Sequence, residues 1–155
     1  MYEEVAKATD YTGSKMIGAD ENARDRILAV DSDFTELGRF WEEAVTACNE
    51  SLKEMLVAGG TKSKTDGTPN KADSTIIIIY EATLEVSLSF DKALTGSVQS
   101  AIRSYFISSI IAQWFKFANK TETEDYFGQA AEFLLAAERI LYSKKKPTVP
   151  SDYFE

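Results

Sequence analysis

The chain has 155 residues, of which 44% are hydrophobic and 12% aromatic, and its formal net charge is −8 at pH 7. A chain of this length fits one domain that buries roughly two thirds of its unfolded surface. One cysteine and no histidine exclude an intramolecular disulfide, a Cys/His zinc site and every mechanism that uses an imidazole base.

The acidic charge is concentrated in residues 1–58, and no segment forms a basic face. Neutralisation of phosphate groups by Lys and Arg supplies most of the affinity of proteins for nucleic acids. The acidic charge balance of this chain therefore argues against sequence-specific DNA or RNA binding. No apolar run reaches the roughly 20 residues that span a bilayer, and the first residues lack a signal-peptide pattern. We therefore expect a soluble protein that does not bind membranes.

The first half of the chain is predicted to be helical. Short helices are expected within residues 2–16 and 20–30, followed by a long helix that Asp31 or Ser32 can cap. Its apolar stripe extends to Leu56, and Gly59 and Gly60 are expected to end it. The residues of this stripe are Phe34, Leu37, Trp41, Ala44, Cys48, Leu52 and Met55.

Residues 61–74 contain no large apolar side chain and include the turn signals Asp66-Gly67 and Pro69-Asn70. The sequence predicts a flexible loop here. Such a long connection inside a domain is either a solvated loop or an arm that becomes ordered on a partner.

Residues 75–90 show a period of two, which indicates a β-strand. Apolar side chains occupy every even position of the segment, and polar ones occupy the odd positions from 81 onward. No turn signal interrupts it, so we expect one long strand whose even face packs on the flanking helices. The even positions are Ile76, Ile78, Tyr80, Ala82, Leu84, Val86, Leu88 and Phe90.

This strand has no evident partner of similar length in the chain. Its backbone groups need hydrogen bonds, so we expect its edges to pair with another subunit. The candidate interface is then the edge of the strand together with the face that points away from the helices. On that face, Ile77 and Ile79 should be covered only in the assembly. The predicted interface residues of the strand are Ile77, Ile79, Glu81, Thr83 and Glu85.

Two further helices are expected after the strand. Asp91 or Thr95 can begin a helix to about residue 118 that is apolar on much of its circumference, and Thr121-Glu-Thr-Glu124 is a capping box for the last one. Residues 148–155 form a tail, either a frayed end or an arm that inserts Tyr153 and Phe154 into a neighbour. The inner face predicted for the last helix is Tyr126, Phe127, Ala130, Phe133, Leu134, Ala137, Ile140 and Leu141.

No group of residues supports catalysis. Cys48 falls on the apolar face of its helix, as a core thiol does, and the adjacent glutamates are typical of solvated helix faces. Gly59-Gly60 lacks a phosphate-loop context, and the lysines at 144–146 suit the negative end of a helix. We expect no catalytic residues, no cofactor and no metal site, and hence a protein that is not an enzyme.

The order of the segments resembles small head–tail adaptor proteins, also called head-completion or connector proteins, of tailed bacteriophages. The resemblance rests on Phe34-Thr-Glu-Leu-Gly-Arg-Phe-Trp-Glu-Glu-Ala44, on the extended strand, and on Ile110-Ile-Ala-Gln-Trp-Phe-Lys-Phe-Ala-Asn-Lys120 before the capping box. The closing Leu141-Tyr-Ser-Lys-Lys-Lys-Pro147 is similar to endings of Bacteroidales phage and prophage proteins. The 59–74 loop departs from the pattern.

The predicted fold is mainly α: a bundle of about four helices in one domain, residues 1–147, with one long strand at about 75–90 inserted after the flexible loop. The resemblance implies a structural virion protein at the neck, made in the bacterial cytoplasm. It would form a ring, commonly of twelve copies, bind portal and tail proteins, and pass DNA through an acidic lumen. The alternatives are another neck subunit, such as a tail terminator, and a helical protein-binding module without a virion role.

Overall fold

The computed structural model describes residues 7, 34–65, 76–118 and 120–144. The helices predicted within residues 2–16 and 20–30, and the tail with Tyr153 and Phe154, lie outside this described part. So do residues 66–74 of the predicted loop.

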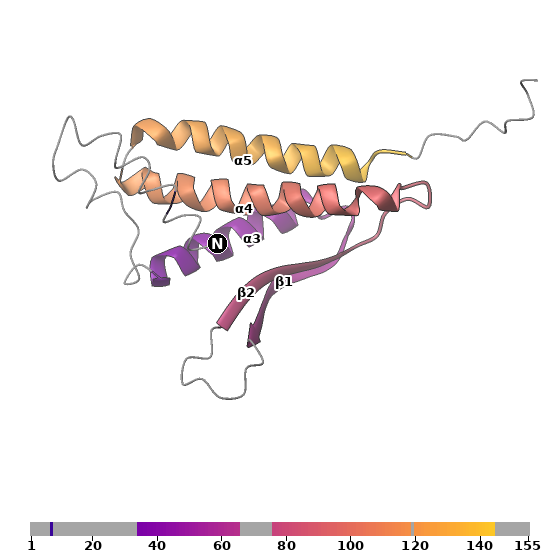
Figure 1. Cartoon of the computed structure of the whole chain (residues 1–155), viewed down its shortest axis with the longest axis horizontal. Coiled ribbons are helices and arrows are strands. Elements are labelled where there is room, and N and C mark those ends of the chain that lie inside the picture. Colours follow the sequence, from indigo (N-terminus) through magenta and orange to yellow (C-terminus); the bar gives the residue numbers. More distant parts are fainter. Residues whose placement is uncertain (1–6, 8–33, 66–75, 119, 145–155) are drawn as a thin grey trace, which may run out of the picture.

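Three α-helices make up most of the described residues: α3 (Phe34–Ser51), α4 (Thr95–Ala118) and α5 (Lys120–Leu141). The helices α4 and α5 run antiparallel along their lengths, and α3 lies against the side of α4 away from α5 (Figure 1). The mainly helical prediction is therefore confirmed. The described part nevertheless contains three α-helices and not four.

The described residues also form a two-stranded antiparallel sheet. Strand β1 (Leu56–Thr65) pairs with β2 (Ile76–Leu84), with Thr61 opposite Tyr80 and Gly59 opposite Ala82. The prediction of a strand without a partner in its own chain is wrong, because the segment after α3 pairs with one edge of β2. The strand is also shorter than predicted, since it ends at Leu84. Residues 61–65, predicted as loop, belong to β1.

The helix that was predicted to reach Leu56 ends at Ser51. A tight turn follows, in which the Met55 N–H donates to the Leu52 carbonyl at 2.9 Å, and β1 then begins. Leu52 and Met55 are still buried, because the turn returns both side chains to the core. Apolar spacing alone did not distinguish this turn from a continuing helix.

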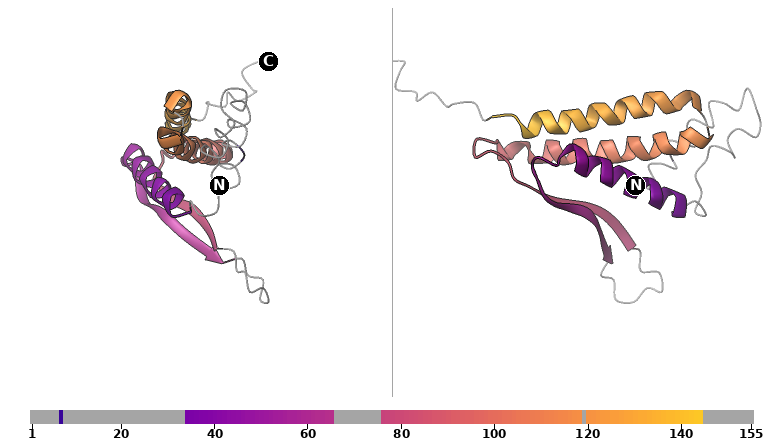
Figure 2. Two further views of the ribbon diagram at one scale, coloured as in Figure 1. Left: turned by 90° about the vertical axis from the view of Figure 1, so that its left-hand side faces the viewer. Right: turned by 180° about the vertical axis from the view of Figure 1, so that it is seen from behind.

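The core lies where α3, α4, α5 and the inner face of β2 meet. Trp41, Tyr80 and Tyr105 surround Phe106, with ring centroids 4.7, 5.0 and 5.2 Å from its own. On the other side of α4, Phe115 is fully buried and packs on Tyr126 of α5. The helix α4 therefore lies between α5 and the layer formed by α3 and the hairpin (Figure 2).

The even positions whose side chains are described, from Tyr80 to Phe90, mostly behave as expected, whereas the side chains of Ile76 and Ile78 lie outside the described ones. Tyr80, Leu84, Val86 and Phe90 pack against the core. Leu88 does not: it lies in a turn after β2 and its side chain is fully exposed. The chain then enters a short 3₁₀ turn, η2 (Lys92–Leu94), whose N-terminus the Asp91 carboxylate caps by accepting from Ala93 N–H at 3.0 Å.

No helix in the described part of the chain combines the length and the apolar composition needed to cross a membrane.

Candidate interaction surfaces

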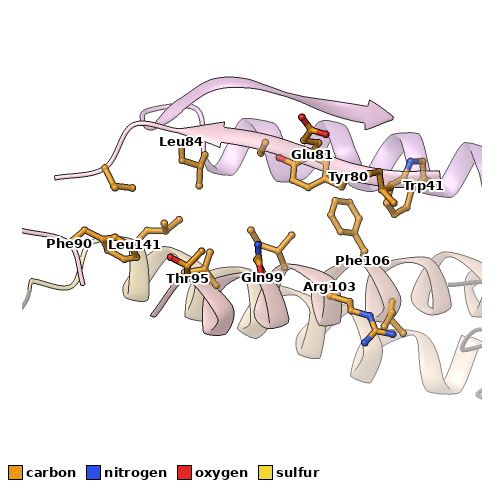
Figure 3. Close-up of a pocket in the computed structure, with 16 residues that line it drawn as sticks. Trp41, Tyr80, Glu81, Leu84, Phe90, Thr95, Gln99, Arg103, Phe106 and Leu141 are labelled. Atoms are coloured by element: carbon orange, nitrogen blue, oxygen red, sulfur yellow. The ribbon is translucent and has the colours of Figure 1, made fainter. Parts of the chain in front are cut away.

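A groove of about 660 Å³ separates β2 from α4. We call it the β2–α4 groove. Figure 3 shows Phe90 and Leu141 at one end and Trp41 with Phe106 at the other. The volume falls within the range of about 300–1,000 Å³ that is typical of sites for small-molecule ligands.

The α4 wall of the groove has an apolar floor and a polar rim. Val98 and Phe106 are buried in the floor, whereas Gln99 and Arg103, which lie between them in the sequence, are exposed on the rim. The Glu81 carboxylate lies above β2, on the side away from α4 (Figure 3). Arg103 is therefore the charged side chain on the α4 rim among the described lining residues.

Two hydrogen-bonded networks hold the hairpin on α3, beside the groove. The Trp41 indole N–H donates to Thr61 Oγ1 at 2.9 Å, and that hydroxyl donates to Glu42 Oε1 at 2.9 Å. Asn49 connects both strands: its Oδ1 accepts from the Tyr80 hydroxyl at 2.8 Å and its Nδ2 donates to the Gly59 carbonyl at 3.3 Å. Sequence reasoning did not find these contacts.

Cys48 is fully buried beneath the hairpin, as predicted for a core thiol. Burial raises its pKa from the ordinary 9.0 to about 11, a hydrogen bond with Tyr80 partly offsets this, and the charge of Glu138 adds to it. The thiol therefore stays protonated at neutral pH, and thiolate chemistry is suppressed.

The folded protein is expected to lose stability as the pH rises from about 9 to about 11. The pKa of Cys48 is higher in the folded state than in the unfolded state. Its contribution to the free energy of unfolding is therefore complete below the unfolded-state pKa and is lost as the pH rises through the folded-state pKa. Burial also raises the pKa values of Tyr80 and Tyr105, which act in the same direction. Urea midpoints across this interval measure the effect. Cys48→Ala should show a smaller decrease, and an equal decrease would contradict this assignment.

A second surface is a row of exposed apolar side chains on α5 and its last turn. We call Phe127, Ala131, Leu135 and Tyr142 the α5 ridge; the three large ones are 39%, 48% and 59% exposed. At 3.6 residues per turn the four lie within a strip about 80° wide. Phe127 was predicted to face inward, and this prediction is wrong. The other residues predicted for the inner face of α5 do pack in the core.

Hydrogen bonds fix the end of α5 that bears Tyr142. The Ser51 hydroxyl donates to the Glu138 carboxylate, and the Tyr142 hydroxyl donates to Glu54 Oε2 at 3.0 Å. These contacts join the end of α3 to the end of α5, so the ridge is held in a set direction relative to the hairpin.

The predicted interface residues of the strand divide into two groups. Glu81, Thr83 and Glu85 are exposed, as an interface surface in the free chain must be. Ile79 is half-buried and lines the β2–α4 groove, so its cover comes partly from its own chain. Ile77 pairs with Lys64 in the hairpin register, and its side chain lies outside the described ones.

An acidic surface covers the outer face of α3. Glu42, Glu43 and Glu50 are exposed. Arg39 pairs with Glu36 at 2.7 Å and approaches Glu43 at 3.8 Å, and Lys53 pairs with Glu50 at 2.6 Å. Such exposed pairs contribute little stability. The glutamates on this face outnumber Arg39 and Lys53, so its local potential is negative.

Within the described residues, no group of three or more His, Cys, Asp or Glu side chains is arranged to hold a metal ion.

Comparison with known proteins returned no family model, no curated protein and no solved structure that matches this chain.

Proposed function

We propose that this protein is a structural subunit that assembles with copies of itself, and more specifically a ring-forming head–tail adaptor of a tailed bacteriophage. In this role it joins the portal to the tail at the neck of the virion and passes DNA through the lumen of the ring. The proposal rests on the resemblance of the segments described above.

The observation that favours self-assembly is the α5 ridge. Three large apolar side chains, Phe127, Leu135 and Tyr142, are 39–59% exposed on one side of one helix. Scattered exposed apolar residues are ordinary, but an aligned row on a helix is typical of a surface that a partner covers. Glu42, Glu43 and Glu50 add an exposed acidic face, which suits a lumen that DNA crosses without binding.

The purified protein is expected to form oligomers larger than a dimer in a concentration-dependent manner. Burying the ridge removes apolar area from water, and higher concentration favours that state by mass action. Sedimentation velocity over a range of concentrations measures the assembly, and negative-stain electron microscopy distinguishes closed rings from filaments. A chain that stays monomeric throughout would contradict the proposal.

The phage-specific part of the proposal needs its own test. Co-purification of the rings with a portal protein encoded beside this gene would support the adaptor role. Rings that bind neither portal nor tail proteins would leave a self-assembling protein with another role.

The β2–α4 groove favours one competing function, a monomeric helical module that binds a peptide of another protein. Its volume and apolar floor suit an extended or helical peptide. A monomeric chain that binds a foreign peptide through this groove would establish that alternative.

A further inference from the structure

We propose that the free edge of β2 binds an extended strand of another protein in which apolar and basic residues alternate. The backbone of this strand pairs with β2, its apolar side chains enter the β2–α4 groove, and its basic side chains lie on the outer face of the sheet. The inference does not depend on self-assembly, because the edge and the groove are both present in a single copy. It applies to a ring subunit and to a monomer alike.

The hairpin occupies only one edge of β2. The Glu85 N–H donates to the Met55 carbonyl at 2.7 Å, so the backbone groups of Glu85 point toward the segment that leads into β1. Backbone groups alternate between the two edges along a strand, so those of Tyr80, Ala82 and Leu84 point to the opposite edge. The described sheet has two strands, and the described residues form no backbone hydrogen bond with these three outside the hairpin. Their N–H and C=O groups are therefore available to a further strand.

The β2–α4 groove borders this free edge. Tyr80, Ala82 and Leu84 line the groove, whereas none of its described lining residues belongs to β1. Figure 3 shows Tyr80 and Leu84 directed from β2 toward α4, where Val98 and Phe106 form the apolar floor. Neighbouring strands lie about 4.8 Å apart and successive side chains point to opposite faces. Every second side chain of an added strand therefore points toward α4, and apolar side chains fit there.

The outer face of the sheet is acidic along the same edge. Glu81 and Glu85 are exposed, and neither forms an ion pair with another described residue. The described cation of β1 on this face, Lys62, lies opposite Ile79 and not opposite Glu81. Opposite charges on neighbouring strands stabilise their pairing, so Lys or Arg fits the outward positions of the added strand. These positions lie on the side of β2 away from α4, and hence away from Arg103 (Figure 3).

The partner is a different protein and not a second copy of this chain. Of the two described strands, β1 carries the lysines, and there Lys62 alternates with Thr61 and Ser63. On the free edge of β2, these hydroxyl side chains would enter an apolar groove, and burial of polar groups without hydrogen-bond partners is unfavourable. The strand with apolar residues at these positions therefore comes from another protein.

A synthetic peptide tests the alternating pattern. The peptide Lys-Val-Lys-Ile-Lys-Val-Lys-Ile-Lys, with both ends blocked, should bind the full chain in isothermal titration calorimetry. The control peptide has the same composition with its lysines grouped at one end. It should bind at least about tenfold more weakly, because it cannot direct apolar and basic side chains to opposite faces.

Two N-methylated versions of the peptide test the backbone pairing. One is methylated on its apolar residues and the other on its internal lysines. A strand presents the N–H groups of alternate residues to each edge, so only one version should lose binding, by at least about tenfold. The unmodified peptide should also slow amide hydrogen exchange at Tyr80, Ala82 and Leu84. The amides of Glu81 and Thr83, which face β1, should change little.

Charge reversal tests the outer face. Glu81→Lys combined with Glu85→Lys should weaken binding of the lysine peptide about tenfold and should favour a peptide in which glutamates replace the lysines. The matched control combines Glu124→Lys with Glu132→Lys, which changes the net charge equally at exposed positions of α5. All four glutamates are exposed, so both variants should keep the fold, as circular dichroism can verify.

Three results would overturn the inference. The first is an equal effect of the two N-methylated peptides, which would exclude pairing along one edge. The second is an equal effect of the two charge-reversed variants, which would indicate attraction by net charge alone. The third is unchanged exchange at Tyr80, Ala82 and Leu84. Sedimentation velocity of the free chain tests self-assembly separately, so failure of either proposal is distinguishable from failure of the other.

Discussion

Phe106→Ala is expected to lower the free energy of unfolding by about 3–5 kcal/mol. The Phe106 side chain is 3% exposed and lies where α3, α4 and β2 meet. Its ring contacts the rings of Trp41, Tyr80 and Tyr105. The substitution would remove the transfer free energy of the buried ring. It would also leave a cavity that its three aromatic neighbours cannot fill, because they are held on three different elements. Urea unfolding followed by circular dichroism measures the loss.

The control for this prediction is Phe127→Ala, the same substitution at a ring that is 39% exposed on the α5 ridge. In the monomer it should cost less, about 1–2 kcal/mol, because more than a third of this side chain is already in water. Phe106→Leu should fall between the two, since leucine keeps part of the buried volume. Similar losses for Phe106→Ala and Phe127→Ala would contradict the placement of Phe106 in the core.

Gly59→Ala is expected to lower the free energy of unfolding by about 1–3 kcal/mol, whereas Gly60→Ala should be nearly neutral. A Cβ at Gly59 would lie 2.9 Å from both Asn49 Oδ1 and Leu56 Cδ1, and 3.2 Å from the Tyr80 hydroxyl. No atom lies within 4 Å of a Cβ at Gly60. Neither glycine has a positive φ, so alanine fits both backbones and the two variants differ only in space.

The loss at Gly59 has a specific structural consequence. Asn49 accepts the hydrogen bond from Tyr80 and donates to the Gly59 carbonyl, so displacing it weakens the attachment of both strands to α3. Amide hydrogen exchange should therefore accelerate in β1 and β2 more than in α4. Thermal unfolding and exchange rates of the two variants provide the comparison. Equal effects of the two substitutions would show that Gly59 does not lie against Asn49.

The helices were predictable from local patterns. The apolar spacing of α3 and α5 identifies most of their buried side chains. Of the two predicted starts of α4, Thr95 is the observed one, and Asp91 caps the short turn before it. The inner face of β2 was predictable as well, because a period of two assigns Tyr80 and Leu84 to one side without knowledge of their neighbours. Cys48 followed from its place on the α3 stripe.

The wrong predictions share one cause. The features that they concern are set by contacts between residues far apart in the chain. The sequence Leu56–Thr65 is mostly polar and small, with no alternation, and forms a strand only because β2 lies beside it. Phe127 fits the apolar spacing of α5 equally well whether it faces inward or outward. Phe127 is exposed because α4 covers the neighbouring strip of the α5 surface and not the strip that contains Phe127.

The sequence by itself determined some of the chemistry that these residues cannot perform, because a chain without histidine and with one cysteine has no imidazole base and no intramolecular disulfide in any fold. It also determined the helical segments, because 3.6-residue periodicity and helix caps are properties of consecutive residues. Only the tertiary structure decided the partner of β2, the β2–α4 groove and the α5 ridge. Each of these features depends on where segments far apart in the chain meet, or on which side chains they leave uncovered. A local sequence pattern does not contain that information.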